Sequence, residues 1–335
     1  MHKILKITTD QDNLQEGLFG QVFLWVFEVL PYLDFHQIVP TWEIRSKLYG
    51  EPGNDFIVIP GLLDTQQEHS SAGVEESVAN LVELREKFPV TLGNDWDYIH
   101  KLWHQYFSIP KAISTRADQF PDLTEAFGLH YRGTDKNKAL EETNFVSESD
   151  FIKLADDFIQ CHPSVKTIFI ASDEDSFVEL FRSSYPKHQI VNSGSVIHHK
   201  EQGGQDNTSK GEHALLDCVL LSRCRYLLKC QSALSGFAKV LNPKLEAYRI
   251  SANKLAYWNR DVPYFPDGFL PKYSSKDPQC QELLDRLFEG DWTSNAAVAR
   301  RFAAPVGYEH RGRRRRLLYR LDRLTLGVFG LNWAR

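Results

Sequence analysis

The sequence predicts an α/β protein built around parallel β-sheets. In the second half of the chain, short apolar runs at Phe127–Tyr131, 167–171 and 226–228 alternate with segments of helical character. Strands that alternate with helices form parallel sheets that are covered by helices on both faces. A length of 335 residues suggests two domains. Pro110 and Pro121, with polar residues around them, indicate a boundary between the two halves.

The first 120 residues carry weaker signals. Ile4–Thr8 is predicted to be the first strand, and a polar loop with a glycine follows it. A helix is expected from about residue 19 to residue 33, and Phe56–Ile59 is a short apolar run of strand type. Residues 72–87 and 95–106 are predicted to be helices.

Residues 147–241 carry clearer start and stop signals. Ser147 is predicted to cap a helix, with Asp150 three residues later, which is close to a capping box. That helix is expected to end near Cys161, and residues 173–175 place acids at the start of the next helix, where the helix dipole favours them. The remaining predicted elements are a strand at 189–191, a polar loop at 193–211, and helices at 212–222 and 235–241.

The composition is that of a soluble globular protein, with 42% hydrophobic and 25% charged residues. Five cysteines without a C-x-x-C pair favour reduced, buried thiols over a disulfide framework or a zinc site. The N-terminus lacks the apolar segment of a signal peptide, and no run is long enough for a membrane span. We therefore expect a cytoplasmic protein.

The charge is concentrated at the C-terminal end. Residues 300–335 contain ten arginines against Glu309 and Asp322, which gives +8, so the rest of the chain carries −13. The segment 311–323 and the apolar residues after it fit a basic amphipathic helix on an anionic membrane surface, here the inner face of the membrane. A helix packed on the N-terminal half, or a frayed end, would also fit. Nucleic acid is not expected as a partner, because no known binding module is present.

Candidate site residues follow the predicted strands, where ligands bind in parallel sheets. Residues 130–136 read HYRGTDK and begin where a strand becomes a loop. The Arg132 guanidinium matches phosphate oxygens, Lys136 adds a point charge, and Gly133 lets the backbone approach a ligand closely. A solvated charged loop uses the same residue types, so this alternative stays open.

Two further segments follow strands in the same way. Asp173 belongs to a D-x-D pattern that can hold a divalent metal, although helix capping explains these acids equally well. Ser232 or Ser235 is expected at a helix N-terminus, where a hydroxyl caps the backbone and free amides can bind phosphate. Capping alone would also explain either serine.

In this order, HYRGTDK, TIFIASDEDSFVELFRSSYP and LLDCVLLSRCRYLLKCQSALS resemble the three motifs of the α-1,6-fucosyltransferase superfamily and, more distantly, of protein O-fucosyltransferases. The resemblance covers about residues 127–243. It implies a GT-B-like fold with two Rossmann-like lobes and the donor site in the C-terminal lobe. It further implies GDP-fucose as donor, a glycan or glycolipid acceptor, inversion at the anomeric carbon, and no metal or other cofactor. The expected regions are 1–120, the acceptor-side lobe, 121–295, the donor lobe, and 296–335, the basic tail.

Motif positions also imply roles for single residues. Arg132 would hold the β-phosphate of the donor, and His130 and Asp217 would lie near the guanine. Ser232 or Ser235 would donate to the pyrophosphate, and Asp173 would lie in the donor cleft.

This sequence departs from the family pattern at two places. Gly133 stands where the motif has a second arginine, and the catalytic carboxylate is displaced, so Glu141 is the first candidate base and Asp135 the second. A loop with His198 and His199 could close over the donor, or be a surface loop. A donor lobe that uses another GDP-sugar, and a non-catalytic nucleotide- or sugar-binding protein, remain alternatives.

Overall fold

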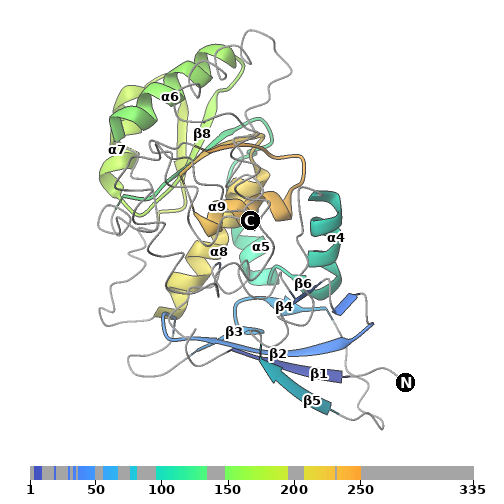
Figure 1. Cartoon of the computed structure of the whole chain (residues 1–335). Coiled ribbons are helices and arrows are strands. Elements are labelled where there is room, and N and C mark those ends of the chain that lie inside the picture. The colour runs from blue at the N-terminus through green and yellow to red at the C-terminus, as the bar shows by residue number, and fades with distance from the viewer. Residues whose placement is uncertain are drawn as a thin grey trace, which may run out of the picture.

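The computed structural model describes residues 4–9, 19, 29–30, 33–34, 37–49, 56–66, 76–80, 96–133, 148–194, 207–230 and 232–249. It contains two main β-sheets, one in each half of the chain. Helices lie between the two sheets and on the far side of the C-terminal sheet (Figure 1). The predicted closing loop around His198 and the basic tail lie outside the described residues. No helix among the described residues is long and apolar enough to cross a membrane.

The N-terminal sheet has the order β3-β2-β1-β5. Its strands are β1 (Ile4–Thr8), β2 (Val39–Ser46), β3 (Phe56–Ile59) and β5 (Glu76–Asn80). The first strand was predicted correctly, and it pairs in parallel with β2 on one side and with β5 on the other. Alternate residues of β1 and β2 are buried, so one face of this sheet packs on the core.

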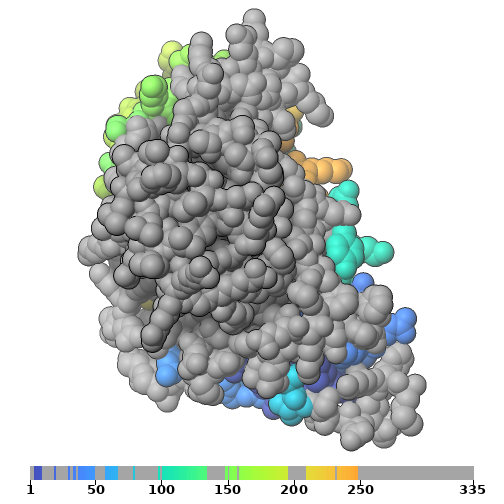
Figure 2. Space-filling model, viewed as in Figure 1, coloured from blue at the N-terminus to red at the C-terminus, as the bar shows by residue number. Residues whose placement is uncertain are grey.

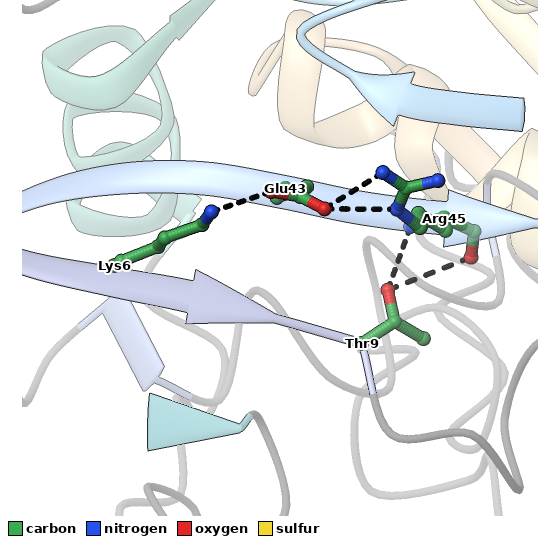
Figure 3. A network of polar contacts seen from close by, with 4 residues as sticks. All are labelled: Lys6, Thr9, Glu43 and Arg45. Carbon is green, nitrogen blue, oxygen red and sulfur yellow. Dashed lines mark hydrogen bonds and ion pairs between the residues drawn. The ribbon is translucent and has the colours of Figure 1, made fainter. Parts of the chain in front are cut away.

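Charged side chains lie in a row across the opposite face of β1 and β2 (Figure 3). The Glu43 carboxylate is 2.7 Å from Lys6 Nζ and accepts hydrogen bonds from Arg45 Nε and Nη2 at 2.9 and 2.8 Å. These two cations lower the pKa of Glu43. At the end of β1, Thr9 Oγ1 accepts a hydrogen bond from Arg45 N at 2.7 Å. These side chains therefore support the pairing of β1 with β2 up to the carboxyl end of β1.

The predicted helix at 72–87 is wrong in its centre, because Glu76–Asn80 is strand β5. Glutamate and alanine favour a helix locally, but pairing with β1 satisfies the backbone of this segment and overrides that preference. Ala79 is buried while Val78 is 66% exposed, as alternation in an edge strand requires.

The C-terminal sheet has five parallel strands in the order β11-β10-β7-β8-β9. The strands are β7 (Phe127–Tyr131), β8 (Thr167–Ser172), β9 (Gln189–Asn192), β10 (Tyr226–Lys229) and β11 (Glu246–Arg249). The chain runs outward from β7 to β9 and then returns to the other side of β7. The parallel sheet predicted from the sequence is therefore confirmed, and its order reverses between β7 and β10.

Helices cover both faces of this sheet, as predicted. On one face, α6 (Glu148–Cys161) and α7 (Asp175–Ser184) pack on Phe127, Leu129 and Tyr131. On the other face, α8 (Asn207–Arg223) and α9 (Ala233–Leu241) share a core with the N-terminal sheet. The helices α4 (Trp96–Tyr106) and α5 (Lys111–Ala117), with the short strands β4 (Asp64–Thr65) and β6 (Phe107–Ser108), complete that middle layer.

Most predicted boundaries in this half agree with the structure. The helix predicted to begin after Ser147 starts at Glu148 and ends at Cys161. The loop predicted at 193–211 is too long, because α8 already begins at Asn207. The four cysteines among the described residues are free thiols, and three of them are buried.

Residues of α4 and of the N-terminal sheet lie at the right and lower edges of the molecular surface (Figure 2). Tyr98 of α4 is 37% exposed. The inner side of α4 is apolar, and Trp103 stacks on Phe107 with ring centroids 4.6 Å apart. Phe107 also packs against Trp42 of β2, with ring centroids 5.1 Å apart, so buried aromatic side chains join the middle layer to the N-terminal sheet.

Gly211 near the start of α8 provides a test of the packing between the two halves. A Cβ atom at this position would lie 2.4 Å from Leu62 Cδ1 and 3.1 Å from Tyr49 Cδ1, both in the N-terminal half. We expect Gly211→Val to lower the free energy of unfolding by about 1–3 kcal/mol through overpacking. Urea denaturation followed by circular dichroism measures this change. Unchanged stability would contradict the close approach of α8 to Leu62.

Candidate functional site

The candidate site lies where the strand order reverses, at the carboxyl ends of β7 and β10. Open parallel sheets bind ligands in the crevice at this point. Arg132 and Gly133 directly follow β7, and Cys230 and Ser232 follow β10. The two ends stay together beyond the strands, because Cys230 N donates to His130 O at 3.1 Å.

His130 is joined to the start of α9. Its Nδ1 lies 2.9 Å from Ser235 Oγ, and Ser235 Oγ donates to Ser232 O at 3.3 Å. When the Ser235 hydroxyl donates to Ser232 O, the tautomer of His130 that fits carries the proton on Nδ1 and donates it to Ser235 Oγ. The imidazole then presents Nε2 as a hydrogen-bond acceptor.

The charge state of His130 agrees with this arrangement. Burial, with the positive charges of Arg132 and Lys229 adding to it, lowers the pKa of His130 to about 3. The side chain is only 5% exposed, so its charged form is poorly solvated. His130 is therefore neutral at pH 7 and acts as a hydrogen-bonding group, not as a cation.

Asp173 holds the turn that follows β7. Its Oδ1 accepts a hydrogen bond from Gly133 N at 2.9 Å. This bond joins the segments that follow the neighbouring strands β8 and β7. The capping explanation for this residue is wrong, since α7 has Glu174 as its N-cap residue with no side-chain cap bond. The nearby Ser172 Oγ accepts from Glu174 N at 3.1 Å instead. Asp173 thus positions the backbone beside Arg132.

The start of α9 faces the same crevice. Ser232 is the N-cap residue, but its side chain makes no cap hydrogen bond, so capping alone does not explain it. The first backbone bond within the helix runs from Gly236 N to Ser232 O at 3.2 Å, and the amides of Ala233, Leu234 and Ser235 precede it. Amides in this position, with the helix dipole behind them, attract anions.

Asp217 approaches the site from α8. The next residue, Cys218, lies 3.3 Å from Leu234 O, which brings this turn of α8 against the first turn of α9. Burial raises the pKa of Asp217 to about 7, although a hydrogen bond with Ser193 opposes the shift. Its Oδ1 is buried and has no hydrogen-bond partner among the described residues. An oxygen buried in this way is costly unless a ligand donates to it.

Sequence reasoning missed one buried charge at this site. Lys229, the last residue of β10, is 0% exposed and pairs in register with His130. It lies within the apolar run YLLKC, where it was not distinguished from the strand around it. The available signal was a lysine at the predicted carboxyl end of a strand buried along its length.

The structure thus brings His130, Arg132, Gly133 and Asp173 to one edge of the sheet, together with Ser232 and Ser235 of α9. The other candidates, Asp135, Lys136 and Glu141, lie outside the described residues. Within the described part of the chain, no three His, Cys, Asp or Glu side chains are grouped to hold a metal ion.

No protein-family model and no curated protein sequence matches this chain. Among solved structures it is similar to the fucosyltransferase NodZ from Bradyrhizobium, at 14% identity and a TM-score of 0.45, over 75% of this chain and 96% of that chain. POFUT1 in complex with GDP has 12% identity and a TM-score of 0.46, over 73% of this chain and 98% of that chain. FUT1 from Arabidopsis thaliana in complex with GDP has 13% identity and a TM-score of 0.44, over 74% of this chain and 70% of that chain.

The hydrogen bond from Gly133 N makes Asp173 testable by substitution. We expect Asp173→Ala to lower the free energy of unfolding by about 1–3 kcal/mol, because a buried N–H loses its acceptor. Asp173→Asn keeps an acceptor oxygen, so it should lower the free energy of unfolding by clearly less than Asp173→Ala does. Chemical denaturation of the three proteins provides the comparison. Equal losses for alanine and asparagine would show that this bond does not hold the turn.

The raised pKa of Asp217 predicts a pH-dependent stability. Between the ordinary value of 3.8 and about 7, the folded state binds more protons at Asp217 than the unfolded state does. This group therefore makes wild-type stability fall as pH rises through that window. We expect the free energy of unfolding of Asp217→Asn, relative to that of wild type, to rise by up to about 4 kcal/mol from pH 4 to pH 7. Above pH 7 the difference should stay constant. Denaturation at several pH values measures the difference, and a difference that is also constant from pH 4 to pH 7 would contradict the burial of Asp217.

Proposed function

We propose that this protein is an inverting, metal-independent glycosyltransferase that moves fucose from GDP-fucose to a hydroxyl group of a glycan. The observation that carries the proposal is the position of Arg132 at the reversal of the strand order, beside neutral His130 and the amides of α9. A guanidinium and helix N-terminal amides together suit a diphosphate. GDP-fucose is proposed as the donor because the three sequence motifs resemble those of fucosyltransferases.

The groups on α8 suit the guanine base of such a donor. Guanine presents two adjacent N–H donors, and Asp217 can accept both once its carboxyl group has lost its proton. The binding would give the buried Oδ1 of Asp217 a partner. His130 Nε2 offers a further acceptor on the same side of the sheet. Adenine lacks this pair of adjacent donors, so the arrangement favours guanine.

The proposed reaction is a single displacement at the anomeric carbon. The acceptor hydroxyl oxygen forms the new bond on the face opposite to the diphosphate, and a carboxylate takes the hydroxyl proton. Glu141 remains the first candidate for this base and Asp135 the second. The bond to the diphosphate breaks, and GDP leaves with the electron pair. Arg132 and the amides of α9 stabilise the charge that develops on GDP.

Calorimetry with GDP, UDP and ADP, each with and without EDTA, tests the donor class and the absence of a metal. Tight binding of GDP alone, unchanged by EDTA, is the expected result. Hydrolysis of GDP-fucose without acceptor then separates a catalyst from a binding protein, and a panel of GDP-sugars separates fucose from other donors. Binding of another nucleotide, or of none, would overturn the proposal.

Arg132→Ala tests the central residue of the proposal. We expect near-normal folding, because Arg132 is partly exposed, and a fall in donor turnover by orders of magnitude. Arg182→Ala on α7, which removes an exposed arginine paired with Glu179, is the matched control and should keep wild-type turnover. The measurement is the rate of GDP release from GDP-fucose. Retained activity in Arg132→Ala would remove Arg132 from the phosphate role.

A further inference from the structure

Lys229 is the one charged side chain in β10, a strand that is buried at every position. Its neighbours Tyr226 and Leu228 belong to the core under α6 and α7, and Leu227 belongs to the core under α8 and α9. Alternation along the strand therefore turns Lys229 to the α9 side. The parallel register places it directly beside His130, whose ring also lies on that side.

Two positive charges flank the neutral imidazole at this edge of the sheet. Arg132 follows β7 and Lys229 ends β10, and both disfavour the protonated form of His130. The Lys229 ammonium group is fully buried at this edge. In a poorly solvated interior its charge reaches further than it would in water. The positive potential of both groups therefore falls on the crevice beyond β7 and β10.

Gly133 stands where the motif has a second arginine. The structure shows that this place is taken by a negative group. A Cβ atom on Gly133 would lie 2.5 Å from the Glu174 carboxylate, so no larger side chain fits there without a shift of Glu174. Of the two residues described after β7, Arg132 carries a positive charge and Gly133 none.

We infer that Lys229 supplies positive charge to the diphosphate site from β10, in addition to Arg132 after β7. This inference rests on the proposed nucleotide-diphosphate donor. Lys229 is a positioning residue that acts through the electrostatic potential at the crevice, together with Arg132 across the His130 ring. The base-recognising groups on α8 do not depend on it.

Lys229→Met removes the charge and keeps the length of the side chain. Lys239→Met is the matched control, because Lys239 lies in the last turn of α9, at the opposite end from Ser232, and donates to Leu245 O. Calorimetry measures the affinity for GDP, and displacement measures the affinity for guanosine. We expect Lys229→Met to lose at least tenfold in GDP affinity with guanosine affinity unchanged. Lys239→Met should match wild type for both.

Each other outcome overturns the inference in a recognisable way. Failure of the wild-type protein to bind GDP removes the proposed function and this inference together. Wild-type GDP affinity in Lys229→Met removes the inference alone. Equal losses for GDP and guanosine, or loss of folding in both Lys229→Met and Lys229→Gln, would assign Lys229 to the stability of the sheet.

Discussion

Parallel pairing of β7 with both β8 and β10 governs the arrangement of the rest of the C-terminal half. Because β7 is buried at every position, its polar residues can be used only at or beyond its carboxyl end. The chain leaves this end toward β8 and returns to β10 on the other side, so the segments after the three strands meet at one edge. The meeting of these segments at one edge is a consequence of strand order.

Burial also determines the chemical character of the residues at this edge. His130 is kept neutral, Asp217 holds its proton up to about pH 7, and Asp173 is used to fix a backbone amide. Each of these groups costs stability when it is taken out of water, and only part of the cost is returned by hydrogen bonds. A binding site of this kind gains from its ligand what the free protein lacks, as the buried oxygen of Asp217 illustrates.

The sequence predicted the C-terminal half well because local signals and tertiary structure agree there. Apolar runs became β7, β8 and β10. His130 lies near the carboxyl end of β7, and Arg132 and Gly133 follow that strand, as expected. The strand at Glu76–Asn80 could not be predicted, since its own residues favour a helix and pairing with β1 decides its structure. Likewise, the bond between Asp173 and Gly133 joins residues forty positions apart, and no local pattern reveals it.

The direction of α9 links the edge of the sheet to the N-terminal half. Its first turn carries Ser232 and Ser235, while Phe237 packs edge-on against Trp103 of α4 with centroids 4.7 Å apart. At its other end, Val240 O lies 2.7 Å from His100 Nδ1, also on α4. A helix held at its middle and its end by a separate helix cannot turn freely about its first residue. Its N-terminal amides are therefore fixed in direction, so that binding of the proposed diphosphate would spend little free energy on reorganisation.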